Sequence, residues 1–528
     1  MVQPVLAQRD ERETHTQRSA NPRRNKAEQG RQRTGELKVG ITAFGAWMVG
    51  VGSIIGSMAW LMHGPMLARA GTLPCILAWT IAAIATVPLA MILMELSSMF
   101  PAAGGPYVYK YYALKRLIPA KGEMIGFLTG WLFWMAAIVA LACMSNGLSN
   151  LLSTMFFGSQ AESPIWFGPL VIFTLFGATT AGNLLPVGKA ASINNVFTVM
   201  KLAMAVGFGL LVACSGHVSL DRILTVTSPQ GEVDLWKNVG SVLMIAMAGF
   251  SFLEVSGCTS AETADARRVV PKAMGLTLIT VTLMYVGMCV AVSSVANFTL
   301  SPDKATLIVP GTSFQATCPS LAGMLGGPMV GNIFAGCVVA SIIGCAFVAL
   351  LAVARVSYSM AKTKLFPAQF AMLDAKTSVP RYALWFQFCC LCIIGVGANL
   401  LSRTGIVSDA YTFLCETFGF MYAFVAMLYG ICLISLRYTD PHMERAFRIG
   451  AKGNTMAWIV CLITIAIWTF SAFFCVSWTH QVAGLLILLS GIPIYMHYRK
   501  PDWRQTPNTE QLEPVRVEVS TKSQSLRQ

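Results

Sequence analysis

Charged residues are scarce in this chain. Only 12% of its 528 residues are Asp, Glu, Lys or Arg, while 55% are hydrophobic. A soluble domain carries roughly 25% charged residues, so the composition excludes a soluble protein and predicts that most of the chain lies in lipid. The longest polar segments are the two ends, 1–38 and 499–528, which are charged, rich in Gln and poor in apolar residues. We expect both ends to be disordered.

Signatures of several other protein classes are missing. The six histidines are scattered and form no His-Glu-x-x-His motif, so we expect no enzyme, no metal site and no cofactor. No filter motif or ring of like charges indicates a channel. The net charge of +14 comes without the interleaved aromatics of a nucleic-acid interface, so we expect no nucleic-acid partner. Of the 15 cysteines only Cys318 falls outside an apolar run, and we expect no structural disulfide.

Long apolar runs are abundant. A membrane-crossing helix needs about 20 mostly apolar residues, and runs of this length predict twelve spans. The spans cover residues 40–63, 73–98, 124–154, 165–185, 193–214, 239–260, 272–295, 329–358, 382–400, 408–436, 456–477 and 480–498. The positive-inside rule then puts both ends of the chain in the cytoplasm, because few basic residues fall in outward loops. We predict a multi-pass, all-α protein of the cell membrane, with the lipid bilayer as its surroundings.

Two of the spans have weak helix centres. Glycine and serine alternate with apolar residues between Gly52 and Ser57, and an acid joins them between Gly249 and Gly257. Irregular backbone survives in lipid only where it faces protein or a water-filled cavity. Interruptions in the first helix of each half are typical of an inverted repeat around a transporter's binding site. The predicted halves are 39–214 and 239–436, and residues 456–498 add two spans.

The chain contains four sequence motifs whose order along the chain is informative. They are Gly52 to Met58 with Gly64 and Pro65, Glu95 to Tyr107, Glu254 to Pro271, and Ala354 to Ala361 with Leu365 to Pro367. Together they resemble the amino acid–polyamine–organocation (APC) superfamily of secondary transporters over residues 37–440. The resemblance implies a LeuT-type fold with twelve transmembrane helices, a 5+5 inverted repeat plus two extra helices, and broken helices one and six. It also implies an amino acid permease.

The resemblance places the binding site at the two breaks. Unwound helix ends expose N–H groups that favour a carboxylate and C=O groups that favour an ammonium, so two breaks suit a free amino acid. The expected lining residues are Ile55, Gly56, Ser57 and Met58 at the first break and Phe250, Ser251, Phe252 and Leu253 at the second. We expect the Ser57 hydroxyl to reach the carboxylate; for Ser57 and Ser251 the alternative role is plain helix packing. Met58 and Phe252 stand where the family usually has glycine, which narrows the pocket.

Three ionisable residues inside the spans are candidates for proton coupling or gating. Several family members carry a lysine like Lys201 where sodium sits in sodium-coupled relatives, so Lys201 is either a proton switch or a fixed cation on carbonyls of helix one. Glu254, after the second break, carries a proton, gates the path or braces the backbone. Glu416, on span ten, is off the family pattern and neutralises a cationic substrate, relays a proton or pairs with a polar neighbour.

Other polar residues receive structural interpretations. His63 is expected to be a hydrogen-bonded structural residue rather than a sensor. Glu95 and the neighbouring residues Arg267 and Arg268 stand at predicted cytoplasmic helix ends, where they either close an inward gate or anchor the topology. The tyrosines around Lys110 predict an interfacial helix of aromatic-belt character. Some eukaryotic family members attach a heavy chain through a loop cysteine; the loop 156–164 has none, so we expect no disulfide-linked heavy chain.

The third span often sets substrate specificity in this family. Here it carries no charge between Trp131 and Leu141. We therefore predict proton-coupled symport of a small or apolar neutral amino acid by alternating access. Two alternatives stay open: an antiporter of a cationic amino acid or amine with Glu416 as counter-charge, and a transceptor that senses an amino acid without transporting it.

Overall fold

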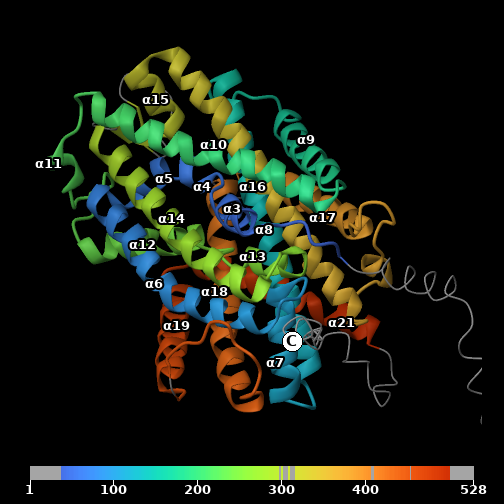
Figure 1. Cartoon of the computed structure of the whole chain (residues 1–528). Coiled ribbons are helices and arrows are strands. Elements are labelled where there is room, and N and C mark those ends of the chain that lie inside the picture. The colour runs from blue at the N-terminus through green and yellow to red at the C-terminus, as the bar shows by residue number, and fades with distance from the viewer. Residues whose placement is uncertain are drawn as a thin grey trace, which may run out of the picture.

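The computed structural model describes residues 37–295, 299–300, 307–309, 315–405, 409–451 and 453–499. Nearly all of the two polar ends, predicted to be disordered, therefore lies outside the described residues. The described part is a bundle of α-helices (Figure 1). Its β-structure in named strands is one short hairpin, in which β1 (Thr299–Leu300) pairs antiparallel with β2 (Leu307–Ile308). The prediction of an all-α membrane protein is confirmed.

Every predicted span contains an apolar helix. Within the described residues, nine helices are long and apolar enough to cross a membrane, and three shorter apolar helices occupy the remaining predicted spans. The shorter ones are α3 (Ala43–Ile54), α9 (Phe167–Gly182) and α12 (Leu235–Gly249). Two of these three, α3 and α12, are short because they end at the predicted breaks.

The first half of the chain consists of consecutive helices joined by short connections. They are α3, α4 (Met58–Leu61), α5 (His63–Ala70), α6 (Thr72–Met99), α7 (Gly105–Leu117), α8 (Gly122–Phe157), α9 and α10 (Val187–Cys214). The short α11 (Leu220–Ile223) leads to the second half. That half contains α12, α13 (Val255–Cys258), the 3-10 helix η1 (Ser260–Glu262), α14 (Ala266–Val295), α15 (Cys318–Gly326), α16 (Pro328–Lys362), the 3-10 helix η2 (Ala368–Ala371), α17 (Arg381–Arg403) and α18 (Ala410–Thr439).

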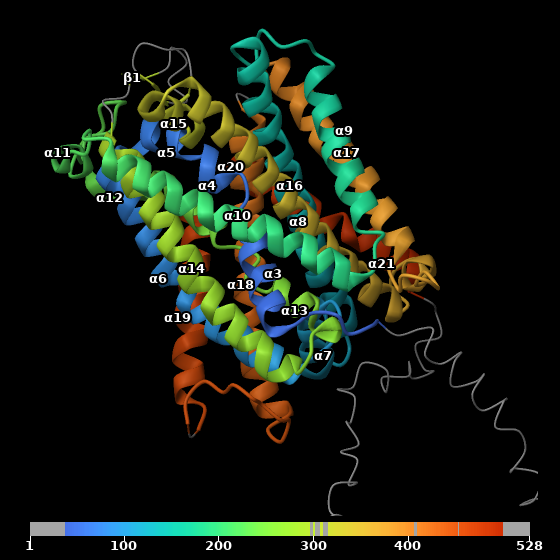
Figure 2. The ribbon, with the colours of Figure 1, turned by 45° about the horizontal axis from the view of Figure 1, so that its top comes forward.

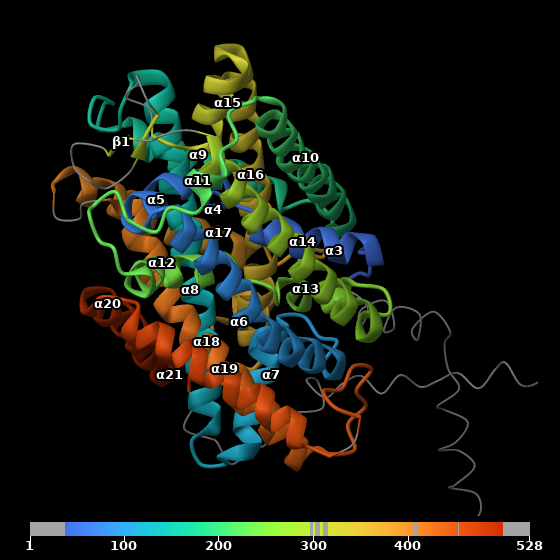
Figure 3. The same ribbon diagram turned by 90° about the vertical axis from the view of Figure 1, so that its left-hand side faces the viewer.

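The last helices are α19 (Thr455–Phe474), α20 (Trp478–Leu489) and α21 (Gly491–Tyr498), which lie together along one side of the bundle (Figure 3). Figure 2 shows α15 and β1 at one end of the bundle and α7 with the α18–α19 loop at the other. We call these ends the α15 face and the α7 face. The broken helix α3–α4 lies in the middle between them (Figure 2).

Close helix packing explains the glycines of the first break. A methyl group on Gly52 would lie 2.4 Å from Asn194 Oδ1, and one on Gly56 would lie 3.0 Å from Met144 Cε. At the second break, Phe252 has a φ of +69°, the left-handed region that costs a non-glycine residue about 1–2 kcal/mol. A glycine at this position would avoid that strain.

The tyrosine-rich segment forms a helix, but its predicted aromatic-belt character is wrong. In α7 the side chains of Tyr107, Tyr109 and Lys110 are fully buried. The helix packs against α8 and α18. Gly130 on α8 makes room for it, because a methyl group there would lie 2.3 Å from the Tyr107 ring. The alternation of aromatic residues reflected two buried helix faces.

Candidate functional site

A small central cavity lies between the two breaks. Its volume is about 40 Å³, room for about three water molecules at ~10–15 Å³ each. An amino acid can enter only when the surrounding side chains move apart. The lining residues are Ser53, Ile54, Gly56, Ser57, Met58, Ala140, Cys143, Met144, Ala248, Gly249, Ser251, Phe252, Cys345, Cys415 and Phe418. None of them is charged.

Five of the eight predicted lining residues are among them: Gly56, Ser57, Met58, Ser251 and Phe252. The other three, Ile55, Phe250 and Leu253, are buried in the surrounding core. The Phe250 ring packs edge-on against the rings of Trp79 and Tyr285. Backbone alternation within each break therefore turns some of the predicted side chains away from the cavity.

Carbonyl groups at the end of α3 are already occupied. Gly52 O accepts a hydrogen bond from Lys201 Nζ at 2.8 Å, and Ser53 O accepts from Cys345 Sγ at 3.2 Å. Ile54 O accepts from the Tyr285 hydroxyl at 3.0 Å. Three other helices thus satisfy the orphan carbonyls that the broken helix leaves. Each of these carbonyls therefore already has one donor within the protein.

The N–H groups after the first break are free. Those of Gly56, Ser57 and Met58 donate to no acceptor in the described part of the chain. They precede or begin α4, whose N-cap residue is Ser57 and has no side-chain cap bond. Neighbouring unpaired N–H groups at a helix start favour an anion, and a carboxylate has the right charge.

The second break offers acceptors. The chain is irregular from Phe250 to Glu254, between α12 and α13. Ser251 is buried and lines the cavity, and its hydroxyl has no hydrogen-bond partner among the described residues. Its carbonyl group likewise accepts no bond from them. Orphan polar groups of this kind are costly unless a ligand or water satisfies them.

Aromatic rings close the cavity beside the second break. Phe252 stacks on Phe418 with ring centroids 5.3 Å apart and meets Phe133 edge-on at 6.3 Å. Phe252 also approaches Tyr422, whose hydroxyl donates to Glu254 Oε2 at 2.7 Å. The ring cluster therefore stands between the cavity and the buried Glu254 carboxylate.

A second, larger cavity lies toward the α15 face. Its volume is about 750 Å³, and its wall includes residues of α15 such as Pro319 and Met324. Tyr411 lines this cavity, and its hydroxyl donates to Ser57 Oγ, a group of the central cavity, at 3.1 Å. Tyr411 thus separates the two cavities, and Ser57 is engaged by it in this state. We call the larger cavity the vestibule.

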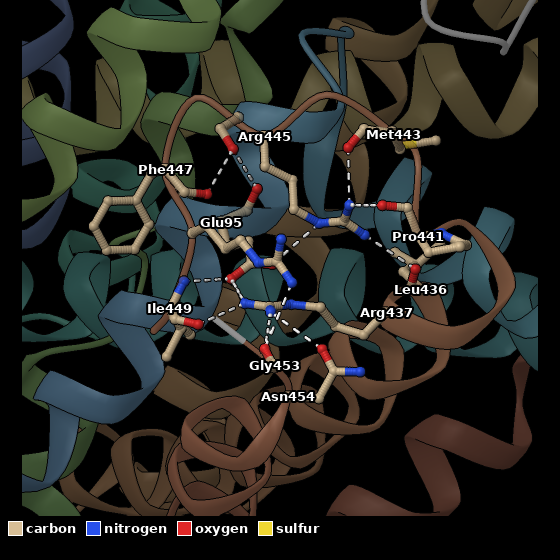
Figure 4. A network of polar contacts seen from close by, with 12 residues as sticks. Glu95, Leu436, Arg437, Pro441, Met443, Arg445, Phe447, Ile449, Gly453 and Asn454 are labelled. Atoms are coloured by element: carbon tan, nitrogen blue, oxygen red, sulfur yellow. Dashed lines mark hydrogen bonds and ion pairs between the residues drawn. The ribbon is translucent and has the colours of Figure 1, made fainter. Parts of the chain in front are cut away.

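The α7 face is closed by ion pairs. The Glu95 carboxylate, at the end of α6, is held by Arg437 in the last turn of α18 and by Arg445 and the N–H of Ile449 from the α18–α19 loop (Figure 4). Glu262 Oε1 and Oε2 accept from the Arg355 guanidinium at 2.8 and 2.9 Å, with both side chains about 1% exposed. The partners of Glu95 thus come from the end of α18 and from the loop after it.

Arg267 forms an ion pair with a different part of the α18–α19 loop. Arg267 pairs with Glu444 of the α18–α19 loop, and the Glu444 side chain is 77% exposed. The segment before α3 is tied to η1 as well, because the N–H groups of Gly40 and Ile41 both donate to Glu262 O at 2.9 Å. The α7 face is therefore closed while the vestibule faces the other end of the bundle.

Lys201 lies beside the first break but outside the cavity lining. Its side chain is fully buried on α10, and among the described residues its one hydrogen bond is to Gly52 O. Among the described residues no carboxylate forms an ion pair with it. An ammonium has three donors, so a single carbonyl leaves its charge without a counter-ion.

Glu416 and His63 lie away from the central cavity. Glu416 Oε1 pairs with Arg69 Nη1 at 2.7 Å, and its Oε2 lies 3.5 Å from His480 Nδ1. Of the three roles predicted for Glu416, pairing with a neighbour is the one the contacts support. The buried His63 has its Nε2 3.0 Å from Ala59 O, one turn earlier in the chain. This contact suits the structural role expected for His63.

Several lining residues escaped the sequence analysis. Cys143 and Met144 come from α8, Cys345 from α16, and Cys415 and Phe418 from α18. Each is an apolar residue inside an apolar span, so no pattern distinguishes it from its neighbours. Tyr411 had one signal, its place just after Asp409, which caps α18 by accepting from the N–H groups of residues 411 and 412.

Comparison with known proteins agrees with this architecture. A family model described as "Amino acid permease" matches residues 41–494. The branched-chain amino acid permease BcaP of Bacillus subtilis (strain 168) is 23% identical over 484 residues, 88% of this chain and 94% of that protein. The serine/threonine exchanger SteT of the same organism is 22% identical over 85% of this chain and 94% of that protein.

One solved structure has the same fold. The crystal structure of a manganese transporter mutant of Eremococcus coleocola aligns with a TM-score of 0.52 and 13% sequence identity. The alignment covers 86% of this chain and 93% of that chain. At this identity the likeness concerns the fold alone, and the predicted LeuT-type architecture is confirmed.

Proposed function

The chain belongs to the amino acid permease family, and from that premise we propose that it is a proton-coupled symporter of a small or apolar neutral amino acid. The substrate assignment rests on one observation: each break has hydrogen-bonding groups without a partner among the described residues, donors at the first break and acceptors at the second. The free N–H groups of Gly56, Ser57 and Met58 suit the carboxylate, and the free hydroxyl and carbonyl of Ser251 suit the ammonium.

The remaining cavity wall supports a neutral side chain. It consists of alanine, cysteine, methionine and phenylalanine side chains from α8, α12, α16 and α18, without a charge. A charged substrate side chain would lose its hydration there without a partner. The small volume of the cavity and the rings of Phe252 and Phe418 favour a compact side chain. Cysteine and methionine sulfurs are polarizable and adapt to apolar groups.

The geometry does not favour the cationic alternative. That alternative needs Glu416 as a counter-charge, but Glu416 is bound to Arg69 and does not line the central cavity. A cationic substrate would have to displace Arg69 to use it. The vestibule is the part of the path that Arg69 reaches.

Lys201 is the proposed proton switch. Its ammonium bonds the carbonyl of Gly52, so the protonated form holds α10 against the end of α3. Because no counter-ion fixes the charge, a proton can leave when the site rearranges. Loss of the proton would remove the bond and release the first break, which links proton movement to the shape of the amino acid site.

The two cavities support alternating access. In this state the α7 face is closed by the Glu95 and Glu262 ion pairs, and Tyr411 separates the vestibule from the central cavity. We propose that the α7 face is cytoplasmic, with both chain ends on that side of the cell membrane, since basic residues gather there. Substrate then enters through the vestibule and leaves through the α7 face.

Uptake into proteoliposomes tests the proposal. The twenty amino acids and small amines are compared with and without an inward proton gradient, for the wild type, Lys201→Ala and Lys189→Ala. Lys189 is the matched control because it lies exposed on the same helix. We expect gradient-driven accumulation of a small neutral amino acid that only Lys201→Ala abolishes. Flux that requires internal substrate and ignores the gradient would indicate an exchanger, and binding without flux would indicate a sensor.

A further inference from the structure

Lys110 is a buried cation with no hydrogen bond to any residue that the structure describes. It comes from α7, outside the membrane-spanning helices, yet its side chain is 0% exposed. Its Nζ atom has no hydrogen-bond partner among the described residues. The ammonium lies 4.6 Å from the centroid of the Tyr429 ring and 5.3 Å from that of Phe133. Two ring faces therefore solvate the charge in place of water.

The anion nearest to this arrangement is Glu254. Its carboxylate is 0% exposed and accepts from the hydroxyls of Tyr422 at 2.7 Å and Tyr429 at 3.1 Å. Tyr429 thus touches both charges, with its hydroxyl on the carboxylate and its ring face under the ammonium. The charges form no direct ion pair within 4 Å among the described residues, so Tyr429 joins them.

We propose that Lys110 is the counter-charge of Glu254 and that this pair makes closure of the α7 face depend on the protonation state of Glu254. The proposal rests on the proposed transport function and adds a second proton-sensitive element to it. Lys110 acts as a positioning residue here, because it acts through Glu254 rather than on the substrate.

The physical reason is the cost of an unpaired buried charge. While both residues are charged, the closed α7 face buries no net charge at this point. A proton on Glu254 would leave the Lys110 ammonium buried without a counter-charge, which destabilises the closed state strongly. Opening the α7 face would hydrate both residues and remove that penalty. A proton that reaches Glu254 therefore drives the transporter toward the α7-open state.

Within the described part of the chain, no other charge nearby can take over this role. The other titratable groups around Lys110 are the thiols of Cys258 and Cys432 and the phenol of Tyr429, and Glu254 also faces the phenol of Tyr109. These groups are neutral near pH 7 at their ordinary pKa values. The nearby Arg355 is neutralised by its own partner, Glu262.

The pKa of Lys110 adds an alkaline limit. Burial lowers it to about 8, although Glu254 acts to raise it. Lys110 is therefore charged at pH 7 and loses its charge as the pH rises through about 8, which leaves Glu254 unpaired. An arginine at this position stays charged at that pH. Closure of the α7 face should weaken above pH 8 in the wild type but not in Lys110→Arg.

Hydrogen–deuterium exchange of α7, α13 and η1 measures closure without any substrate. The variants are Lys110→Met, Glu254→Gln and the double variant, with Lys115→Met as control. Lys115 also lies over a tyrosine ring, 5.6 Å from the Tyr111 centroid, but on a partly exposed part of α7. We expect Lys110→Met to speed exchange at these segments about tenfold or more at pH 7, and the double variant to restore it to within about threefold of the wild type.

The double variant decides between pairing and packing. If Lys110 had a purely structural role, the exchange rate in the double variant would rise by at least the combined increases of the two single variants. That result would overturn the proposal. Equal exchange in Lys110→Met and Lys115→Met would overturn it as well. If Lys110→Met does not fold, the pH dependence of exchange is compared between the wild type and Lys110→Arg. A loss of protection above about pH 8 that persists in Lys110→Arg contradicts the proposal.

Failure of the transport function is detected separately. Uptake by the wild-type protein tests that function, whereas exchange measures the α7 face whether or not any amino acid is carried. In liposomes that do transport, Lys110→Met should lower uptake at least about tenfold at pH 7.

Discussion

Replacing Tyr411 with phenylalanine tests the barrier between the vestibule and the central cavity. The change removes one hydroxyl, which donates to Ser57 Oγ at 3.1 Å, and keeps the ring that packs on Gly147. A neutral hydrogen bond contributes about 0.5–1.5 kcal/mol net, which corresponds to a change of about 2-fold to 13-fold in a rate or equilibrium constant. We expect the barrier to open more often by that factor.

The assay is the dissociation of a radiolabelled amino acid from the purified transporter. Because the α7 face is closed by ion pairs, the label leaves through the vestibule, and the dissociation rate should rise about 2-fold to 13-fold. Tyr495→Phe is the control, since it removes a hydroxyl contact with Glu123 on α8, away from both cavities. An unchanged dissociation rate in Tyr411→Phe would refute the role of Tyr411 as the barrier.

Three further substitutions probe how the fold builds the site. Gly52→Ala would place a methyl group 2.4 Å from Asn194 Oδ1 and push α10 away from α3, so we expect lost uptake and a lower Tm, from about 1–3 kcal/mol of destabilisation. Glu262→Gln leaves the buried Arg355 without its counter-charge and should destabilise the protein by about 3–5 kcal/mol, also read from the Tm. The Tm of Phe252→Gly should be higher than that of Phe252→Ala, because only glycine adopts the left-handed backbone conformation of residue 252 without strain. A lower Tm for the glycine variant would show that the backbone is not strained there.

The membrane fold could be predicted from the sequence because its signals are local. An apolar run of about 20 residues is readable in one window, and each of the twelve predicted intervals contains an apolar helix. The two breaks were readable for the same reason, since glycine, serine and an acid interrupt such runs. The four family motifs placed these breaks within one architecture.

The details of the site depend on contacts between distant parts of the chain. The partner of Ser57 is Tyr411, 354 residues later, and the partner of Glu416 is Arg69, 347 residues earlier. No local pattern specifies such pairs. Lys110 was misread because a lysine among tyrosines looks the same at a lipid surface and in a core, and only the packing of α7 against α8 and α18 distinguishes the two.

The most direct measurement is the affinity of the purified transporter for a neutral amino acid, its methyl ester and its N-acetyl derivative. The account predicts that each derivative binds at least about tenfold more weakly, because each loses charge-assisted hydrogen bonds of about 1.5–3 kcal/mol at one of the two breaks. Equal affinities for the three compounds would contradict recognition of the carboxylate and the ammonium by the two broken helices.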